Sequence, residues 1–388
     1  MHILMIAPEP FFEPRGTPFS EFHRIRALTT LGHTVDLVTY PFGSDVDLPG
    51  LRIIRTLKPP FISRVKIGPS WAKVPLDILL SLTALRLALT RKYDAIHSHE
   101  EGGLIGVVLA ALLRKPHLYD MHSSLPQQIS NFGYGNAKWL AGLFEWVEKL
   151  MLRRSQAVIV ICQDLDDTVK ALGVNVPTLL IENAAGSGAA PEAGTGLRIR
   201  QSLGLTAETP VVLYTGTFEA YQGLDLLYAA MHVVRRTSPE ARLVMVGGDP
   251  DQVTAAKKTV ADAGLQDAVI FTGQRPAAEV PAYLDAASVL VSPRSSGTNT
   301  PLKIYQYLRA GRPIVATRLR THTQVLSDEV AILVEPTADG LAGGILTALS
   351  DATAADAIGQ RARHLAETKY SDEAFIQKTK RAYEVLMS

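Results

Sequence analysis

Short apolar runs rich in β-branched residues recur along the first half of the chain, and each ends in small or polar residues. Helical patterns separate them, such as those over residues 20–31 and 104–113. Strands that alternate with helices predict a parallel sheet with helices on both faces, and continuously apolar strands fit burial on both sides. The expected strands are His2–Ala7, Thr34–Tyr40, Ala95–His99, His117–Asp120, Ala157–Cys162 and Thr178–Ile181.

The composition changes at residues 183–196, NAAGSGAAPEAGTG, which hold almost no large apolar side chain and are typical of a linker or long loop. The alternation then starts again, so we predict two α/β domains, residues 1–183 and 200–372, joined by a linker at 184–199. Several later strands end in glycine, serine or threonine, which lets a ligand approach the carboxyl edge of the sheet. The expected strands are Val211–Tyr214, Arg242–Val246, Val269–Thr272, Val289–Ser292, Pro313–Thr317 and Val330–Val334.

Composition narrows the class of protein. The 388 residues are 47% hydrophobic and 20% charged, as in an ordinary soluble globular protein. The formal net charge of +1, without a basic arm or a nucleic-acid-binding motif, argues against a nucleic-acid partner. The single cysteine, Cys162, excludes an internal disulfide, and its apolar surroundings predict a buried, inert thiol. The N-terminal residues are typical of a strand and not of a signal peptide, which predicts a cytoplasmic location.

Three loops between a strand and a helix are candidate phosphate sites, because free N–H groups and the helix dipole attract anions. The first contains Gly16, although one glycine is as typical of an ordinary turn. The second, residues 216–223, reads GTFEAYQG, and the third, residues 295–307, reads SSGTNTPLKIYQY. A proline is favoured in the first turn of a helix, so Pro301 predicts a helix start that places Lys303 just inside it.

Histidines and carboxylates end two strands of the first half. His97, His99 and Glu100 stand in the sequence IHSHEE, but no further ligand pair has metal-site spacing. We therefore expect a structural or substrate-contacting role there and no metal. Asp120 and His122 end the next strand, where His122 could act as a base, form a hydrogen bond to a ligand, or be an ordinary hydrogen-bonded histidine.

Residues 55–73 carry five basic side chains, no acidic one, and the aromatic residues Phe61 and Trp71. The apolar helix expected over 74–89 is shorter than the ~20 residues of a spanning helix. Basic residues beside aromatics and an amphipathic helix suit an anionic membrane surface, so residues 55–89 are a candidate membrane contact. A connecting loop and an ordinary packed helix explain the pattern equally well.

The order of the motifs resembles that of family-4 glycosyltransferases of the GT-B fold, over nearly the whole chain: GHTVDLVTY, YDAIHSHE, GTFEAYQGLDLLYAA, LVMVGGD, TPLKIYQYLRAGRPIVAT. The resemblance implies two Rossmann-like domains that face each other across a cleft. It implies an acceptor-side N-terminal domain, with the helix at 373–388 packed back on it, and a C-terminal domain that binds a nucleotide diphosphate sugar. It also implies transfer with retention, without a metal or other cofactor.

The chain departs from the family pattern at the charged donor-site positions. The arginine and lysine that the family uses on the diphosphate are replaced by Thr217 and Gln222, and its two glutamates by Thr298 and Gln306. A further common glutamate is replaced by Gln324. Because every replacement can still hydrogen-bond, we interpret the site as retuned and not as inactive.

On this resemblance we expect catalytic roles for His122, Arg294 and Lys303. The expected acceptor-side residues are Arg15, His99 and Asp120. The resemblance does not identify the acceptor; a lipid or a lipid-linked glycan is one class that we consider. Another GT-B enzyme, such as a sugar-nucleotide epimerase, and a catalytically silent sugar-nucleotide- or partner-binding protein remain alternatives. The expected donor-binding residues are Gly16, Gly216, Thr217, Gln222, Gly248, Thr298, Asn299, Thr300, Pro301, Leu302 and Gln306.

Overall fold

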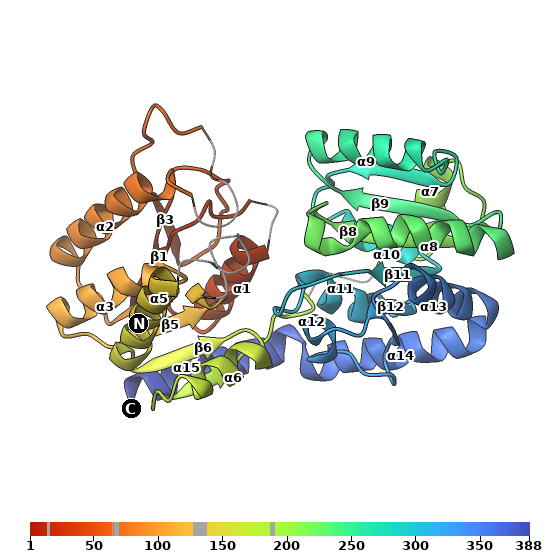
Figure 1. The fold of residues 1–388 in the computed structure, drawn as a ribbon. Helices are drawn as coiled ribbons and strands as arrows, with labels where there is room; N and C mark the ends of the chain where they lie inside the picture. The colour runs from red at the N-terminus through yellow and green to blue at the C-terminus, as the bar shows by residue number, and fades with distance from the viewer. Residues whose placement is uncertain (14–15, 64, 66–69, 127–137, 187–190) are drawn as a thin grey trace. The chain divides into compact units, whose positions relative to one another are not determined.

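The chain forms two compact units. The computed structural model describes residues 1–13, 16–63, 65, 70–126, 138–186 and 191–388. Met1–Asn183 together with Glu373–Ser388 form the N-terminal domain, and Ala184–Asp372 form the C-terminal domain (Figure 1). Each domain is a parallel sheet covered by helices, so the predicted α/β class is confirmed.

The sheet of the N-terminal domain contains, in the part of the chain that is described, seven parallel strands in the order β3-β2-β1-β4-β5-β6-β7. The strand β1, in the interior of the sheet, pairs His2 with Thr34 on one side and Ile3 with Ala95 on the other. Its apolar residues are fully buried, as the continuous apolar pattern predicts. The strands are β1 (His2–Ala7), β2 (Thr34–Thr39), β3 (Leu51–Arg55), β4 (Ala95–His99), β5 (His117–Met121), β6 (Ala157–Val160) and β7 (Thr178–Leu180).

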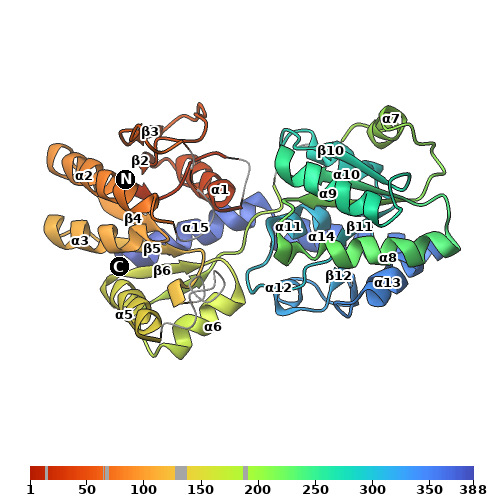
Figure 2. The same cartoon turned by 45° about the horizontal axis from the view of Figure 1, so that its top comes forward.

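Helices cover both faces of this sheet. Apolar residues of α2 and α3 pack on Leu4 and Ile6 of β1, while α5 packs on β5 and β6. On the opposite face, α1 and α15 meet through the buried Arg24, which donates a hydrogen bond to Thr379. Figure 2 shows α2 and α3 side by side, as Figure 1 does. The helices are α1 (Gly16–Thr30), α2 (Lys73–Thr90), α3 (Gly102–Leu113), α5 (Lys138–Arg154), α6 (Gln163–Ala171) and α15 (Asp372–Met387).

The sheet of the C-terminal domain contains, among its described residues, six parallel strands in the order β10-β9-β8-β11-β12-β13. They are β8 (Val211–Gly216), β9 (Arg242–Gly247), β10 (Val269–Gly273), β11 (Val289–Ser292), β12 (Ile314–Thr317) and β13 (Ile332–Val334). One face packs on α10, α11 and α14, and the other on α8 and α13. The helices are α7 (Thr195–Ser202), η1 (Ala220–Gln222), α8 (Leu224–Thr237), α9 (Pro250–Asp262), α10 (Val280–Ala286), α11 (Leu302–Ala310), α12 (Arg320–Thr323), α13 (Ala338–Ser350) and α14 (Ala352–Lys369).

Two expected boundaries are wrong. The helix expected over residues 20–31 already begins at Gly16, because Pro18 lies in the first turn, where no N–H needs a helical partner. The expected linker contains the start of α7. Gly196 packs there against α10, and its N–H donates to the Asp285 carboxylate at 2.9 Å.

None of the described helices is both long and apolar enough to cross a membrane.

Candidate functional site

The loop between β11 and α11 folds around the guanidinium of Arg294. The Nη1 atom of Arg294 donates to the carbonyl of Asn299 and to the hydroxyl of Thr321, both at 2.8 Å. Thr321 also donates to the Asn299 carbonyl at 2.6 Å, and the side-chain amide of Gln324 donates to the Thr298 carbonyl at 2.6 Å. These bonds fix the backbone of the Gly-rich loop from the side of α12.

Lys303 lies in the first turn of α11, which begins at Leu302, and only 8% of its surface is exposed. Its Nζ atom donates to Oε1 of Gln222 at 3.1 Å and lies 3.8 Å from the centre of the Tyr214 ring. Burial, with a smaller contribution from Arg294, holds the pKa of Lys303 well below its usual value. Burial also lowers the pKa of Arg294. Both cations therefore lie where an anion would stabilise them.

The loop after β8 brings its backbone close to Lys303. Gly216 has a φ of +138°, and a Cβ there would lie 3.1 Å from the Tyr214 hydroxyl and 3.2 Å from the Lys303 amine. The Tyr214 hydroxyl donates to the Thr217 carbonyl at 2.7 Å. The carboxyl edge of the sheet thus gathers Gly216, Thr217, Gln222 and Lys303, although Gln222 and Lys303 are 81 positions apart.

The other expected donor-side residues, and Arg15 of the acceptor side, lie at separate places in the fold. Gly248 follows β9, next to the Phe218 ring, while Thr300 and Pro301 are buried at the start of α11. Gln306 is exposed on α11, one turn after Lys303. A Cβ on Gly16 would meet nothing within 4 Å, so no described contact requires a glycine there. Arg15 lies outside the described residues.

The N-terminal domain has a second cluster, centred on the fully buried carboxylate of Asp120. Arg24 Nε donates to Oδ2 of Asp120 at 2.9 Å, and Nε2 of His122 lies 3.3 Å from Oδ1. Burial would raise the pKa of Asp120, but Arg24 and His122 outweigh it and hold the pKa well below its usual value. Asp120 is therefore a carboxylate.

The pKa values of the histidines in this cluster shift in different directions. Burial lowers the pKa of His97 and, together with His97, holds the pKa of His99 well below its usual value. Burial acts in the same direction on His122, but the Asp120 carboxylate outweighs it and raises the pKa of His122. The His99 Nδ1 and His122 Nε2 atoms lie 3.1 Å apart, so a neutral His99 can accept a hydrogen bond from a protonated His122.

His97, His99 and Asp120 offer ligand atoms within 4.8 Å of one another. The guanidinium of Arg24 already lies against the same carboxylate and would repel a cation. His97 and His99 stack with their ring centres 4.7 Å apart, as alternate residues of one strand can. The expectation that no metal is used stays a prediction.

Sequence reasoning missed Arg24, Tyr383 and Tyr214. Arg24 stands 96 positions from Asp120, and Tyr383 stands 286 positions from His97, whose Nδ1 lies 2.7 Å from the Tyr383 hydroxyl. No local spacing could reveal these pairs. A weak signal is that Arg24 lies on the buried side of α1, one position before Ile25 and four before Leu28.

Two family models match the chain in succession. The model of a glycosyl transferase 4-like domain matches residues 23–184, and the model of glycosyl transferases group 1 matches residues 197–365. Each match lies within one of the two domains.

Curated proteins that are similar in sequence to this chain are named as sugar transferases. The chain is 25% identical over 323 residues to the sulfoquinovosyl transferase of Arabidopsis thaliana, covering 81% of this chain and 59% of that protein. It is 31% identical over 185 residues to the GDP-mannose-dependent alpha-(1-6)-phosphatidylinositol monomannoside mannosyltransferase of Mycolicibacterium smegmatis, covering 46% and 48%. The chain thus matches about half of the length of these relatives.

Solved structures share the fold. A sucrose-phosphate synthase of Thermosynechococcus elongatus has a TM-score of 0.80 and 23% identity, with 100% of this chain and 98% of that chain covered. HepE of Anabaena, solved with UDP-glucose, has a TM-score of 0.75 and 16% identity, with 99% of both chains covered. With both family models matched in chain order and the GT-B fold shared from end to end, the chain belongs to the GT4-like glycosyltransferases.

Proposed function

We propose that the protein is a retaining glycosyltransferase that moves a sugar from a nucleotide diphosphate sugar to an acceptor hydroxyl. The observation that carries this proposal is the pair of cations at the carboxyl edge of the C-terminal sheet. Arg294 and Lys303 are mostly removed from water, and no described carboxylate pairs with either. A diphosphate supplies the negative charge that such a pair requires.

The departures from the family pattern fit this assignment. Lys303 lies against Gln222, which stands where the family has its lysine, so the positive charge comes from α11 and not from the loop after β8. Gln324, at the third altered position, donates to the backbone of Thr298 and so keeps the Gly-rich loop in place without a charge.

The proposed reaction breaks the bond between C1 of the sugar and the diphosphate oxygen, and it forms a bond between C1 and the acceptor oxygen. The acceptor proton passes to the leaving diphosphate oxygen, so the atoms balance without a protein nucleophile. Arg294 and Lys303 would stabilise the charge that develops on the leaving group. The protonated His122, held by Asp120, would donate a hydrogen bond to a sugar or acceptor hydroxyl.

A lipid or lipid-linked glycan is the acceptor class that we favour, with residues 55–89 against an anionic membrane. One relative is named for a phosphatidylinositol mannoside, and Phe61 and Trp71 are exposed. The segment carries less unpaired positive charge than its sequence indicates, because Arg55 pairs with Asp45 and Lys73 pairs with Glu101. Two of its five basic residues are therefore neutralised, and Arg64 and Lys66 lie outside the described residues.

The test is a thermal-shift screen of nucleotides and nucleotide sugars, since a ligand of the native state raises the apparent stability. The stabilising donor is then incubated with the protein alone and with candidate acceptors, and proton NMR follows the anomeric signal. Slow donor hydrolysis and a product with the donor's anomeric configuration are expected. Conversion into another nucleotide sugar would instead show an epimerase, and stabilisation without turnover would show a silent binding protein.

A further inference from the structure

The outer surface of the helix layer α2–α3–α5 is unusually apolar. Among the described residues, twelve of the fifteen exposed large hydrophobic side chains lie between positions 57 and 146. Trp71 is 89% exposed and Trp146 is 61% exposed. Such a concentration marks an interaction surface, whereas scattered exposed leucines would not. The twelve residues are Leu57, Phe61, Trp71, Val74, Ile78, Leu82, Leu89, Leu104, Val108, Leu112, Leu143 and Trp146.

The apolar residues form stripes. Val74, Ile78 and Leu82 are spaced by four residues along α2, as Leu104, Val108 and Leu112 are along α3, so each trio lies on one side of its helix. The inner sides of the same helices fill the core on the sheet. Both helices are therefore apolar on two sides, although only one side packs on the part of the chain that is described. We name the surface formed by the twelve residues the α2–α3–α5 face.

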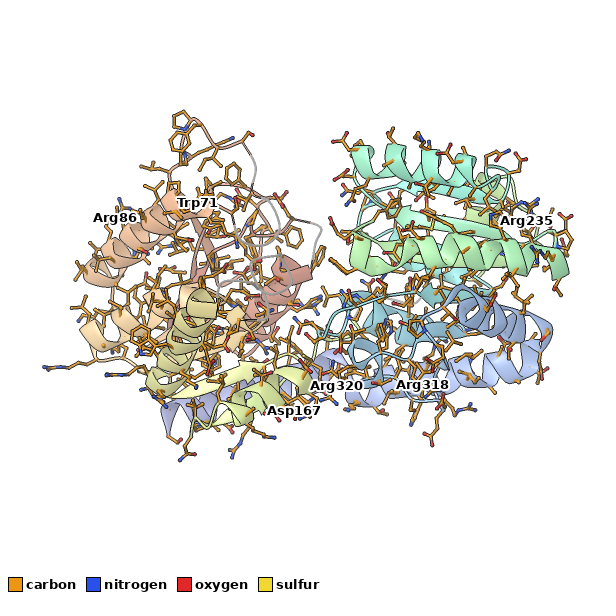
Figure 3. All side chains as sticks on the ribbon, in the orientation of Figure 1. Trp71, Arg86, Asp167, Arg235, Arg318 and Arg320 are labelled. Carbon is orange, nitrogen blue, oxygen red and sulfur yellow. The ribbon has the colours of Figure 1, made fainter. Side chains whose placement is uncertain are left out.

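Basic residues border this face along one edge. Each of the three helices leads into a strand of the parallel sheet, α2 into β4, α3 into β5 and α5 into β6, so their C-terminal ends lie at the same edge of the sheet. Figure 3 shows Trp71 just before α2 and Arg86 in its last turns, both at the surface. The exposed basic residues at these ends are Arg86, Arg91, Lys92, Arg114, Lys115, Arg153 and Arg154, of which Arg91 lies 3.6 Å from the Asp36 carboxylate.

Few acidic residues offset this charge; Asp94, in the loop that also holds Lys92, is exposed and accepts a hydrogen bond from the His2 amide at 2.7 Å. The three helices contain only Asp77, Glu145 and Glu148. Asp77 accepts a hydrogen bond from Tyr40. Glu145 pairs with Lys149 at 2.6 Å, and Glu148 accepts a hydrogen bond from the Leu125 amide at 2.7 Å. The face and its border therefore carry apolar groups and positive charge.

We propose that the α2–α3–α5 face lies flat on an anionic lipid membrane. Its leucines and tryptophans would enter the boundary between headgroups and acyl chains, and the basic border would contact lipid phosphates. A second copy of the chain fits less well, because an isologous pair of such faces would bring two basic borders together. The proposal deepens the proposed function by naming the membrane surface on which a lipid acceptor is met.

This surface differs from the segment expected from the sequence. Residues 55–73 contribute Leu57, Phe61 and Trp71, but most of the face belongs to α2, α3 and α5, and its charge comes from helix ends. A sequence window cannot show this, because the three helices are brought together by the sheet and not by their order in the chain.

The experiment is vesicle binding by the full chain. Vesicles of phosphatidylcholine with one third phosphatidylglycerol should retain the protein in a flotation assay, and vesicles of phosphatidylcholine alone should not. Binding should weaken as salt rises, because screening acts over a Debye length of about 8–10 Å. A quencher on the lipid chains should reduce the tryptophan emission, and part of that quenching should disappear in Trp71→Phe and in Trp146→Phe.

Two pairs of variants locate the surface. Leu82→Glu with Val108→Glu should lower vesicle partitioning at least about tenfold, since it places charge where lipid is expected. Leu197→Glu is the matched control, an exposed leucine of α7 in the other domain. Arg153→Ser with Arg154→Ser should lower partitioning about fivefold per residue. Arg235→Ser with Arg236→Ser, the pair in the last turn of α8, should leave it unchanged.

Vesicle binding that is absent, or equal in all variants, would overturn the proposal. A wild-type dimer in sedimentation that Leu82→Glu with Val108→Glu converts to monomer, without lipid binding, would assign the face to a second copy instead. Donor hydrolysis without vesicles should be unchanged by these substitutions, so failure of the membrane surface and failure of the proposed activity give different results.

Discussion

Lys303 carries its amine among neutral groups, the ring of Tyr214 and the amide oxygen of Gln222. A buried lysine without a carboxylate is costly to keep charged, which is why its pKa is lowered. A diphosphate would reverse this effect by pairing with the ammonium. Burying Lys303 costs folding free energy in the free protein. On the proposed function, pairing with the diphosphate offsets this cost when the donor binds, and more strongly when the sugar leaves and the negative charge increases.

Lys303→Ala should lower turnover on the order of 10²–10³-fold, the range for the loss of one group that stabilises developing charge. The measurement is steady-state transfer, or donor hydrolysis, on protein whose folding is checked by circular dichroism. Lys303→Arg should recover only part of the activity, because a planar guanidinium does not reproduce an ammonium. Lys258→Ala, on the exposed side of α9, is the control. Near-normal turnover in Lys303→Ala would move the diphosphate contact to Arg294.

His322 makes stability depend on pH. Its Nε2 atom lies 2.8 Å from the Ser292 hydroxyl, and burial lowers its pKa from 6.5 to about 3. Between these values the unfolded chain binds the proton and the folded chain does not, so stability falls as pH drops below 6.5. At about pH 5 the loss is about 2 kcal/mol. His322→Gln should remove this part of the acid sensitivity.

The readout is the urea midpoint of the C-terminal domain from neutral pH down to about pH 4.5, where the wild-type midpoint should fall steeply. His364→Gln, an exposed histidine on α14, should keep the wild-type pH slope. An unchanged slope in His322→Gln would mean that another group, such as a carboxylate, sets the acid sensitivity.

Gly223 links η1 to α8 and supports the loop that carries Arg294. Its φ is +68°, and a Cβ there would lie 2.1 Å from the Pro293 carbonyl oxygen. Gly223→Ala should therefore destabilise the C-terminal domain by more than the ~1–2 kcal/mol of left-handed strain alone, and it should weaken nucleotide binding. Gly204→Ala shares the positive φ, +72°, but meets nothing within 4 Å. An equal loss of unfolding free energy in the two variants would show that the contact with Pro293 does not contribute to the destabilisation.

At the level of elements, apolar runs predict the strand positions well. All the expected strands are present, with ends within two residues, because buried parallel strands are continuously apolar. The pattern misses β3, since LRIIR carries two arginines and lies half-exposed at the sheet edge. The Gly-rich loop is also found from composition. The partners of Lys303 and Asp120 are not, because the fold alone brings such distant positions together.

On the scale of the whole chain, α15 returns to the N-terminal domain after the complete C-terminal domain has been built. It supplies Thr379 and the Phe375 ring to the buried Arg24, and it pairs Lys378 with Glu182. Arg24 in turn holds Asp120, whose carboxylate raises the pKa of His122 against the effect of burial. The last helix of the chain therefore supports the electrostatics of a cluster formed from its first half.

Tyr383 provides the sharpest test of this support. Tyr383→Phe removes the hydroxyl that lies 2.7 Å from Nδ1 of His97 and leaves a buried ring nitrogen without that partner, which should destabilise the N-terminal domain by about 1–3 kcal/mol. Tyr228→Phe is the matched control, because the buried Tyr228 hydroxyl has no hydrogen-bond partner among the described residues and its loss should be neutral or stabilising. Hydrogen exchange followed by mass spectrometry assigns each effect to its domain, since amides of β4 and β5 should exchange faster only in Tyr383→Phe. Faster exchange confined to the C-terminal domain, or none at all, would show that α15 does not stabilise the buried cluster around Asp120.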